Sequence, residues 1–405
     1  MGIKRAERSW LRMDSDKQKI FTKNFIVLAA INIFLLMAYF MLFVISSPYA
    51  SERFNASPST AGLVAGLMVI GSLVGRFVTG HFITILGGKK VLFAGLIIYI
   101  CSMALYFAAH SLQLLVLVRF FSGIGVGCVG TAVGTLIAYI VPIGRRGLGI
   151  SYFTLSTILA LALGPFAGIF LLQYTSYEVI FMVCLLFGVV SLGIAFSLSI
   201  QGLVPILAPE NRPSLFKLSN YIDYRVVPFS VVVLLVCTGW GDVQAFISFH
   251  AEATGLAGAA SLFFLVYAGL VLFTRPLVGR IFDWYGEHVI IYPALLLMAL
   301  GLMVLGLADT TFLILLAGAL LGIGFGNFQS TGQATVLKLV PPERYGQATS
   351  TFFIFLDFGI GFGPYLSGFI VPMIGYDGMF EVSTGVSLLG VILYYFLHGR
   401  QKEKS

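Results

Sequence analysis

The feature that most restricts the fold is a series of apolar stretches, each long enough to cross a lipid bilayer. A helix of about 20 apolar residues spans the roughly 30 Å hydrocarbon core, and twelve such stretches follow one another along the 405 residues. Hydrophobic residues make up 59% of the chain and charged residues 10%, so a water-soluble fold would leave its surface largely apolar. We therefore predict an all-α integral membrane protein with twelve transmembrane helices in the lipid bilayer. The predicted spans are residues 24–46, 61–84, 90–109, 113–140, 148–172, 179–198, 226–248, 258–282, 289–308, 311–337, 346–372 and 379–398.

Basic residues set the predicted orientation of these spans. A formal net charge of +7 would also suit a nucleic-acid-binding protein. If the N-terminus is cytoplasmic, however, 20 of the 24 lysines and arginines fall in the tails and loops on that side, as the positive-inside rule requires. We predict a multi-pass protein of the cell (inner) membrane with both termini cytoplasmic and no nucleic-acid partner.

The second half of the chain repeats the first. A shift of 199 positions aligns five clusters of glycine, proline and charged residues without a gap. Because each copy crosses the membrane an even number of times, the pattern predicts two parallel six-helix repeats, as in carriers that work by rocking. The predicted parts are an N-terminal tail (1–23), a first half (24–198), a cytoplasmic linker (199–225), a second half (226–398) and a C-terminal tail (399–405).

Short turns in corresponding places of the two halves carry a family resemblance. Gly80 to Lys89 and Gly279 to Gly286 resemble the Gly-x-x-x-Asp-Arg-x-Gly-Arg-Lys motif of the major facilitator superfamily, in particular its twelve-span drug:proton antiporter branch. Glycines such as Gly87 permit a tight turn and close helix approach. The resemblance assigns the motif's acid to gating at the inner side. In the first half Thr84 stands in its place, and the second half supplies the acid as Asp283.

Arg119 opens a second motif, in the fourth span. The segment Arg119 to Gly125 resembles the family's Arg-x-x-x-Gly-x-Gly, whose arginine is assigned a part in proton coupling. An arginine within a span needs a carbonyl, an acid or water as partner. The alternative is that Arg119 lies near the outer interface and extends its charged end to water.

Gly164-Pro165 in the fifth span gives a direction of transport. The segment from Ala160 to Gly168 resembles the Gly-Pro motif that the family associates with exporters. Simple helix packing through small residues explains the same pattern. Its repeat partner in the eleventh span is Gly363-Pro364.

Asp357 is the principal candidate for proton coupling. It lies about eleven residues into the eleventh span, hence roughly 16 Å deep, where a carboxyl group that exchanges a proton serves a proton-coupled carrier. Arg76 lies at similar depth in the second span, and spans two and eleven face each other in the superfamily fold. We expect an ion pair between Asp357 and Arg76 that breaks on protonation, or else a permanent structural pair.

Several further polar or aromatic residues are candidates to line a central substrate pocket, although polar side chains also join helices to one another. Asp242 is among them, but it lies nearer the outer end, where it would simply face water. The candidates are Asn32, Tyr39, Trp240, Asp242, Gln244, Asn327, Gln329 and Gln333.

No enzyme motif, cofactor-binding loop or metal-binding pattern is found in the sequence. It lacks a Gly-x-x-x-x-Gly-Lys-[Ser/Thr] loop and His-Glu-x-x-His, and its five histidines are scattered. We therefore expect no enzyme activity, no cofactor and no metal. The histidines are His81, His110, His250, His288 and His398.

The resulting hypothesis is a monomeric secondary transporter that exports a small organic molecule in exchange for protons by alternating access. One alternative is a carrier for a particular metabolite, such as a sugar or a siderophore-like metal chelator. A non-transporting membrane sensor on the same scaffold is another.

Overall fold

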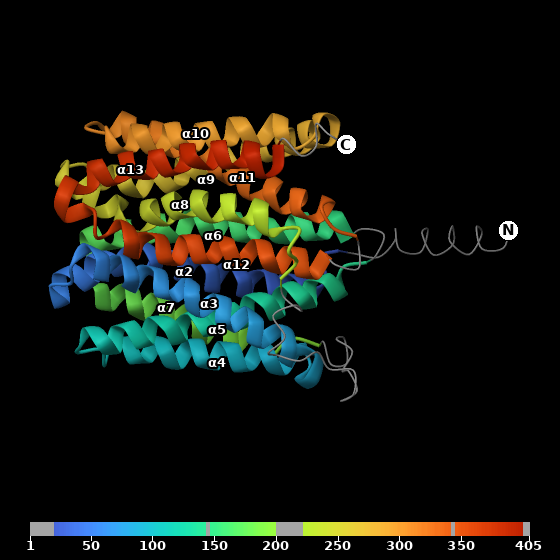
Figure 1. Cartoon of the computed structure of the whole chain (residues 1–405). Coiled ribbons are helices and arrows are strands. Elements are labelled where there is room, and N and C mark those ends of the chain that lie inside the picture. The colour runs from blue at the N-terminus through green and yellow to red at the C-terminus, as the bar shows by residue number, and fades with distance from the viewer. Residues whose placement is uncertain (1–19, 143–145, 200–221, 342–344, 400–405) are drawn as a thin grey trace.

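Twelve long α-helices account for nearly all of residues 20–142, 146–199, 222–341 and 345–399, which the computed structural model describes (Figure 1). Those of the first half are α2 (Lys23–Phe54), α3 (Pro58–Leu86), α4 (Gly88–Tyr106), α5 (Leu112–Ile140), α6 (Arg146–Tyr174) and α7 (Tyr177–Ala195). Those of the second half are α8 (Val227–Ala253), α9 (Ala257–Tyr285), α10 (His288–Gly306), α11 (Thr311–Lys338), α12 (Tyr345–Ser367) and α13 (Val371–Tyr394). The π-helical turn Tyr395–Gly399 continues α13. The predicted all-α fold is confirmed.

Eleven of these helices, within the described residues, are long and apolar enough to cross a membrane. The remaining long helix, α12, carries Asp357 and packs along α3 and α8. Each predicted span corresponds to one helix. The predicted tails and most of the predicted linker lie outside the described residues.

The first helix is longer than its predicted span, because packing continues it past Pro48. We expected the span to end at residue 46, but α2 continues to Phe54. The first added turn is buried, with Ser47 and Ala50 fully enclosed, so packing against neighbouring helices stabilises the helix beyond a proline that would locally break it. Asn55, in the left-handed region at φ 50°, ends it.

The repeat extends from the sequence to the contacts between helices. Three glycines of α5 lie against α3 and α4, and the glycines 199 positions later in α11 lie against the residues 199 positions later in α9 and α10. The halves are therefore built on one frame, and their third helices, α4 and α10, lie at opposite margins of the molecule (Figure 1). The matched contacts are Gly123 with Met68 and Gly322 with Tyr267, Gly125 with Tyr99 and Gly324 with Met298, and Gly127 with Ser72 and Gly326 with Val271.

The motif turns of the two halves also match. Gly87 and Gly286 have φ angles of 86° and 83°, a conformation that side chains other than glycine rarely adopt. Gly80 and Gly279 instead have open space where a side chain would stand. Among the described residues no neighbour lies within 4 Å of that space, so these two glycines make no close helix contact there in this conformation.

The halves meet through the pairs α3 with α12, α6 with α9 and α2 with α8. The tightest approach joins α3 and α12 at the end remote from the start of α2. There Gly66 of α3 lies directly against Gly361 of α12, and the Ser59 hydroxyl donates to the Tyr365 carbonyl at 3.0 Å. Because these glycines lack side chains, the two helix backbones touch and the boundary between the halves is closed at this end.

Candidate functional site

An ion pair crosses the boundary between the halves near its middle. Nη1 of Arg76 on α3 lies 3.2 Å from Oδ2 of Asp357 on α12, and the two side chains are 41% and 6% exposed. The guanidinium also lies over the Phe353 ring, 5.5 Å from its centroid. The expected contact is thus present, and its part in proton coupling stays a prediction.

Two further helices approach this pair. Helix α8 packs along α12, where Cys237 lies against Gly359, and α2 packs on both α3 and α8. Since α2 and α3 belong to the first half and α8 and α12 to the second, the pair lies where four helices of both halves converge. A change in the charge of Asp357 therefore changes its electrostatic attraction to Arg76 at the place where these helices meet.

Arg119 is completely buried. From α5 it reaches α3, where Nε donates to the Val64 carbonyl at 2.8 Å and Nη2 to the Ala65 carbonyl at 2.7 Å. Nη1 contacts Met68 Sδ at 3.0 Å and the Tyr106 hydroxyl at 3.4 Å. The alternative that Arg119 extends to the outer interface is wrong, since backbone carbonyls exposed by the close α3–α5 contact satisfy the guanidinium inside the bundle.

Asp242 is also buried, at 1% exposure. Its Oδ2 accepts hydrogen bonds from Ser367 of α12 at 2.9 Å and from Ser383 of α13 at 2.7 Å. The expectation that Asp242 simply faces water is wrong, because these two helices cover it. Sequence reasoning missed both serines, which lie 125 and 141 positions away, a separation that leaves no local spacing signal.

Trp240 belongs to the core of the second half rather than to an open pocket wall. It is 3% exposed and lies stacked between Tyr267 and Phe325, with ring centroids 4.4 Å and 4.9 Å away. Aromatic rings of α9 and α11 stack on Trp240 in this conformation, and its part in a substrate pocket stays a prediction.

Two of the predicted polar pocket residues join neighbouring helices within one half. The Asn32 amide donates to Ser156 at 2.8 Å and Thr157 at 3.1 Å, tying α2 to α6. The Asn327 amide donates to Thr274 at 2.9 Å, tying α11 to α9. These contacts fit the interhelical alternative.

Three of the remaining pocket candidates are partly accessible. Tyr39, Gln329 and Gln333 are half-buried, whereas Gln244 of α8 is 2% exposed. The side chain of Asp283 lies outside the described residues, although its backbone continues α9.

The Gly-Pro segments act as close packing surfaces in both halves. On α6, Gly164 lies against the backbone of Met37 on α2, and Pro165 continues the helix. On α12, Gly363 lies against Thr238 of α8, while the carbonyl of Pro364 meets Gly62 of α3. Helix packing therefore accounts for these residues in this conformation, and a role in export stays a prediction.

The sequence matches a known family over nearly its whole length. The model of the Major Facilitator Superfamily matches residues 28–312 and 293–405. The chain belongs to this superfamily. An uncharacterized MFS-type transporter of Burkholderia mallei is 27% identical over 370 residues, covering 88% of each chain. The MFS-type transporter YhhS of Shigella flexneri is 24% identical over 368 residues, covering 88% of this chain and 87% of YhhS.

Solved structures of the same fold agree. The nucleoside transporter NupG superposes with a TM-score of 0.73 at 14% identity, covering 93% of this chain and 99% of NupG. A POT family transporter in complex with a thioalcohol-conjugated peptide gives a TM-score of 0.80 at 13% identity, covering 96% of this chain and 99% of the other. The protein is a membrane transporter of this superfamily and not an enzyme.

Proposed function

We propose that this protein exports a small organic molecule across the cell (inner) membrane in exchange for protons, as a monomer working by alternating access. Both termini are then cytoplasmic, and the protein resembles the drug:proton antiporter branch of the superfamily. The observation that carries this proposal is the Arg76–Asp357 ion pair across the boundary between the halves.

The coupling follows from the charge of Asp357. As a carboxylate it attracts Arg76, which holds α12 to α3. As a neutral acid it loses this attraction, so protonation favours conformations in which the halves separate there. Asp357 is nearly enclosed, whereas Arg76 is partly exposed. A proton therefore reaches Asp357 through the space between the two halves.

The closed end of the bundle supports alternating access. With a cytoplasmic N-terminus, the tight contact of Gly66 with Gly361 lies at the outer side, so this conformation is closed outward. Because the small residues of both halves interlock there, outward opening requires α3 and α12 to separate. The Arg76–Asp357 pair lies along the same two helices, where its breaking assists that separation.

The direction of transport and the substrate class are proposed from the Gly-Pro segment and from the structural neighbours. Gly164-Pro165 packs α6 on α2, and the resemblance of this segment to exporters is the support for outward transport. NupG is a nucleoside transporter, and another structural neighbour holds a peptide conjugate. Nucleosides and short peptides therefore join lipophilic drugs, sugars and metal chelators in the substrate panel.

Transport in liposomes with an imposed pH gradient tests the proposal. The purified protein is reconstituted, and uptake of each panel compound is followed together with internal pH. We expect at least one compound to move against its gradient and to cause proton movement in the opposite direction. Proton movement that no compound changes would refute antiport.

Asp357→Asn provides the decisive variant, with Asp309→Asn as its control. Asp309 is exposed in the loop before α11, so the same chemical change there leaves the inter-half boundary intact. We expect Asp357→Asn to abolish proton-driven transport at normal expression and Asp309→Asn to retain it. Full activity of Asp357→Asn would end the coupling hypothesis.

A further inference from the structure

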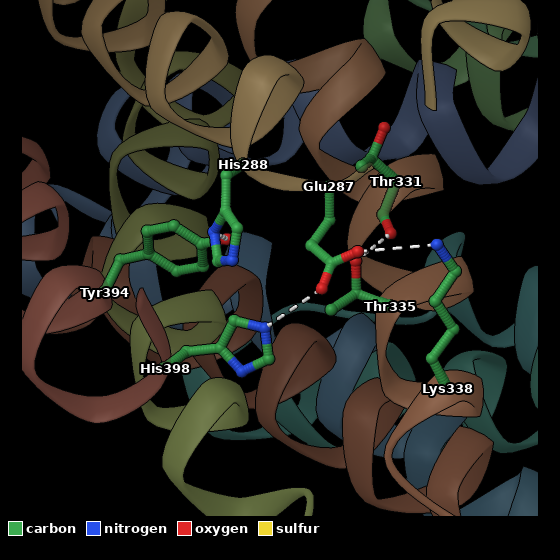
Figure 2. Close-up of polar contacts among 7 residues, drawn as sticks. All are labelled: Glu287, His288, Thr331, Thr335, Lys338, Tyr394 and His398. Atoms are coloured by element: carbon green, nitrogen blue, oxygen red, sulfur yellow. Dashed lines mark hydrogen bonds and ion pairs between the residues drawn. The ribbon is translucent and has the colours of Figure 1, made fainter. Parts of the chain in front are cut away.

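Two histidines and a glutamate from distant parts of the second half gather at one end of the bundle. Glu287 and His288 stand at the junction of α9 and α10, and His398 lies in the π-helical turn after α13. One potential ligand atom from each of the three lies within 4.8 Å of the other two. Figure 2 shows the three side chains pointing toward a common centre.

The cluster is enclosed and its side chains are held in place. Glu287 is 3% exposed and His398 6%. The Tyr394 hydroxyl lies 2.7 Å from Nδ1 of His288, which leaves Nε2 of that ring for another partner. Glu287 meets Lys338 Nζ with Oε2 at 3.4 Å and faces His398 Nε2 with Oε1 at 3.7 Å. A network of this kind orients metal ligands in proteins.

The donor set fits a divalent transition metal ion. Two imidazole nitrogens and one carboxylate oxygen form a common protein environment for Zn²⁺, with ligand bonds of about 2.0–2.2 Å and water in the fourth position. Tetrahedral ligands at that distance lie about 3.4 Å apart. The present separations of up to 4.8 Å therefore close by small rotations of the three side chains.

The cluster does not come from the frame that the halves share. At the positions 199 residues earlier stand Gly88, Lys89 and Ser199, which offer no comparable ligand set. The helix that carries His398 also ends in a π-turn, a conformation found often at functional sites. The matching positions of the first half therefore lack this ligand set.

We propose that Glu287, His288 and His398 form a binding site for Zn²⁺ or a similar divalent transition metal ion. The bound ion joins the α9–α10 junction to the end of α13. It thereby ties the last helix to the turn that follows the Gly279 to Gly286 motif. The site lies apart from the Arg76–Asp357 pair, so it goes beyond the proposed transport function.

Zinc binding to the purified full-length protein in detergent tests the site. Affinity and stoichiometry are measured with zinc alone by competition with a chelating dye, and Co²⁺ in place of zinc reports coordination through its visible spectrum. The variants are His288→Ala, His398→Ala and Tyr394→Phe. His110→Ala is the control, because His110 is exposed in the loop before α5, away from the cluster.

We expect one zinc ion per protein, a tetrahedral Co²⁺ spectrum and normal binding by His110→Ala. Each ligand variant weakens binding at least about 100-fold, and Tyr394→Phe about 10- to 100-fold, as for other residues that orient a ligand. Thermal melting without zinc checks that the variants fold. The proposal would be overturned if His398→Ala kept a saturable zinc site. It would also be overturned if the well-folded wild type showed no saturable binding at micromolar zinc. Glu287 would then be an ion-pair partner only.

Discussion

A single methyl group at Gly66 is expected to disfavour closure of the boundary between the halves at its outer end. Alanine at this position places Cβ 2.6 Å from the carbonyl carbon of Gly361 and closer still to its oxygen, whereas real Cβ contacts essentially never lie under 3.0 Å. Both partners are backbone atoms, so no side-chain rotation relieves the overlap. The helices α3 and α12 must separate.

The size of the effect follows from the cost of overpacking. An extra methyl in a tightly packed interface costs about 1–3 kcal/mol. Because the open conformation does not bear this cost, the equilibrium between closed and open shifts toward open by about 5- to 150-fold. Gly193→Ala on α7 is the matched control, since a Cβ there meets only open space.

Labelling of a cysteine at position 59 measures this shift. Ser59 is 5% exposed and bonded to the Tyr365 carbonyl, so a Ser59→Cys reporter is protected while the end is closed. The exposed native Cys101 is first replaced by serine. We expect a membrane-impermeant maleimide to label the reporter about 5- to 150-fold faster with Gly66→Ala and at the unchanged rate with Gly193→Ala. Equal rates for Gly66→Ala and the parent would refute the close-packing account.

Three further predictions concern buried side chains. Arg119→Lys loses one of two charge-assisted hydrogen bonds to backbone carbonyls, because an ammonium lacks the planar fork of arginine. We expect this loss to lower the stability of the protein by about 1.5–3 kcal/mol. An unchanged melting temperature in detergent would contradict this. Asp242→Asn keeps an oxygen that accepts from both serines, so its melting temperature stays near the parent's, while Asp242→Ala loses about 3 kcal/mol. Equal losses in the two variants would show that the charge itself is needed. Trp240→Ala removes a stacked core ring and costs about 3–5 kcal/mol, and we expect it to lower melting temperature rather than substrate affinity measured on the folded fraction.

Most of the fold could be predicted because lipid imposes simple rules on the chain. Each span must satisfy its own backbone hydrogen bonds and so becomes a helix, and the 199-residue offset gives the pairing of helices within each half. The end of α2 could not be predicted, since Pro48 reads as a stop while buried contacts made by other helices continue the segment.

Within the candidate site, the contact between Arg76 and Asp357 could be predicted, from their depth in the membrane and from the resemblance to the superfamily fold. Arg76 and Asp357 lie at similar depth on helices that face each other, and they do pair. Trp240 and Asp242 look the same in sequence whether they line a cavity or face a neighbouring helix, and the second is what occurs. His288 and His398 meet across 110 positions through the packing of α10 on α13, which their spacing does not reveal.

We propose that a proton at Asp357 is exchanged for the transported compound. The most direct test is proton release on addition of a transported compound to purified protein in weakly buffered detergent solution, at a pH where Asp357 of the substrate-free protein carries a proton. We expect release of about one proton from the wild type and none from a folded Asp357→Asn variant that still binds the compound. Equal release from both proteins would contradict it.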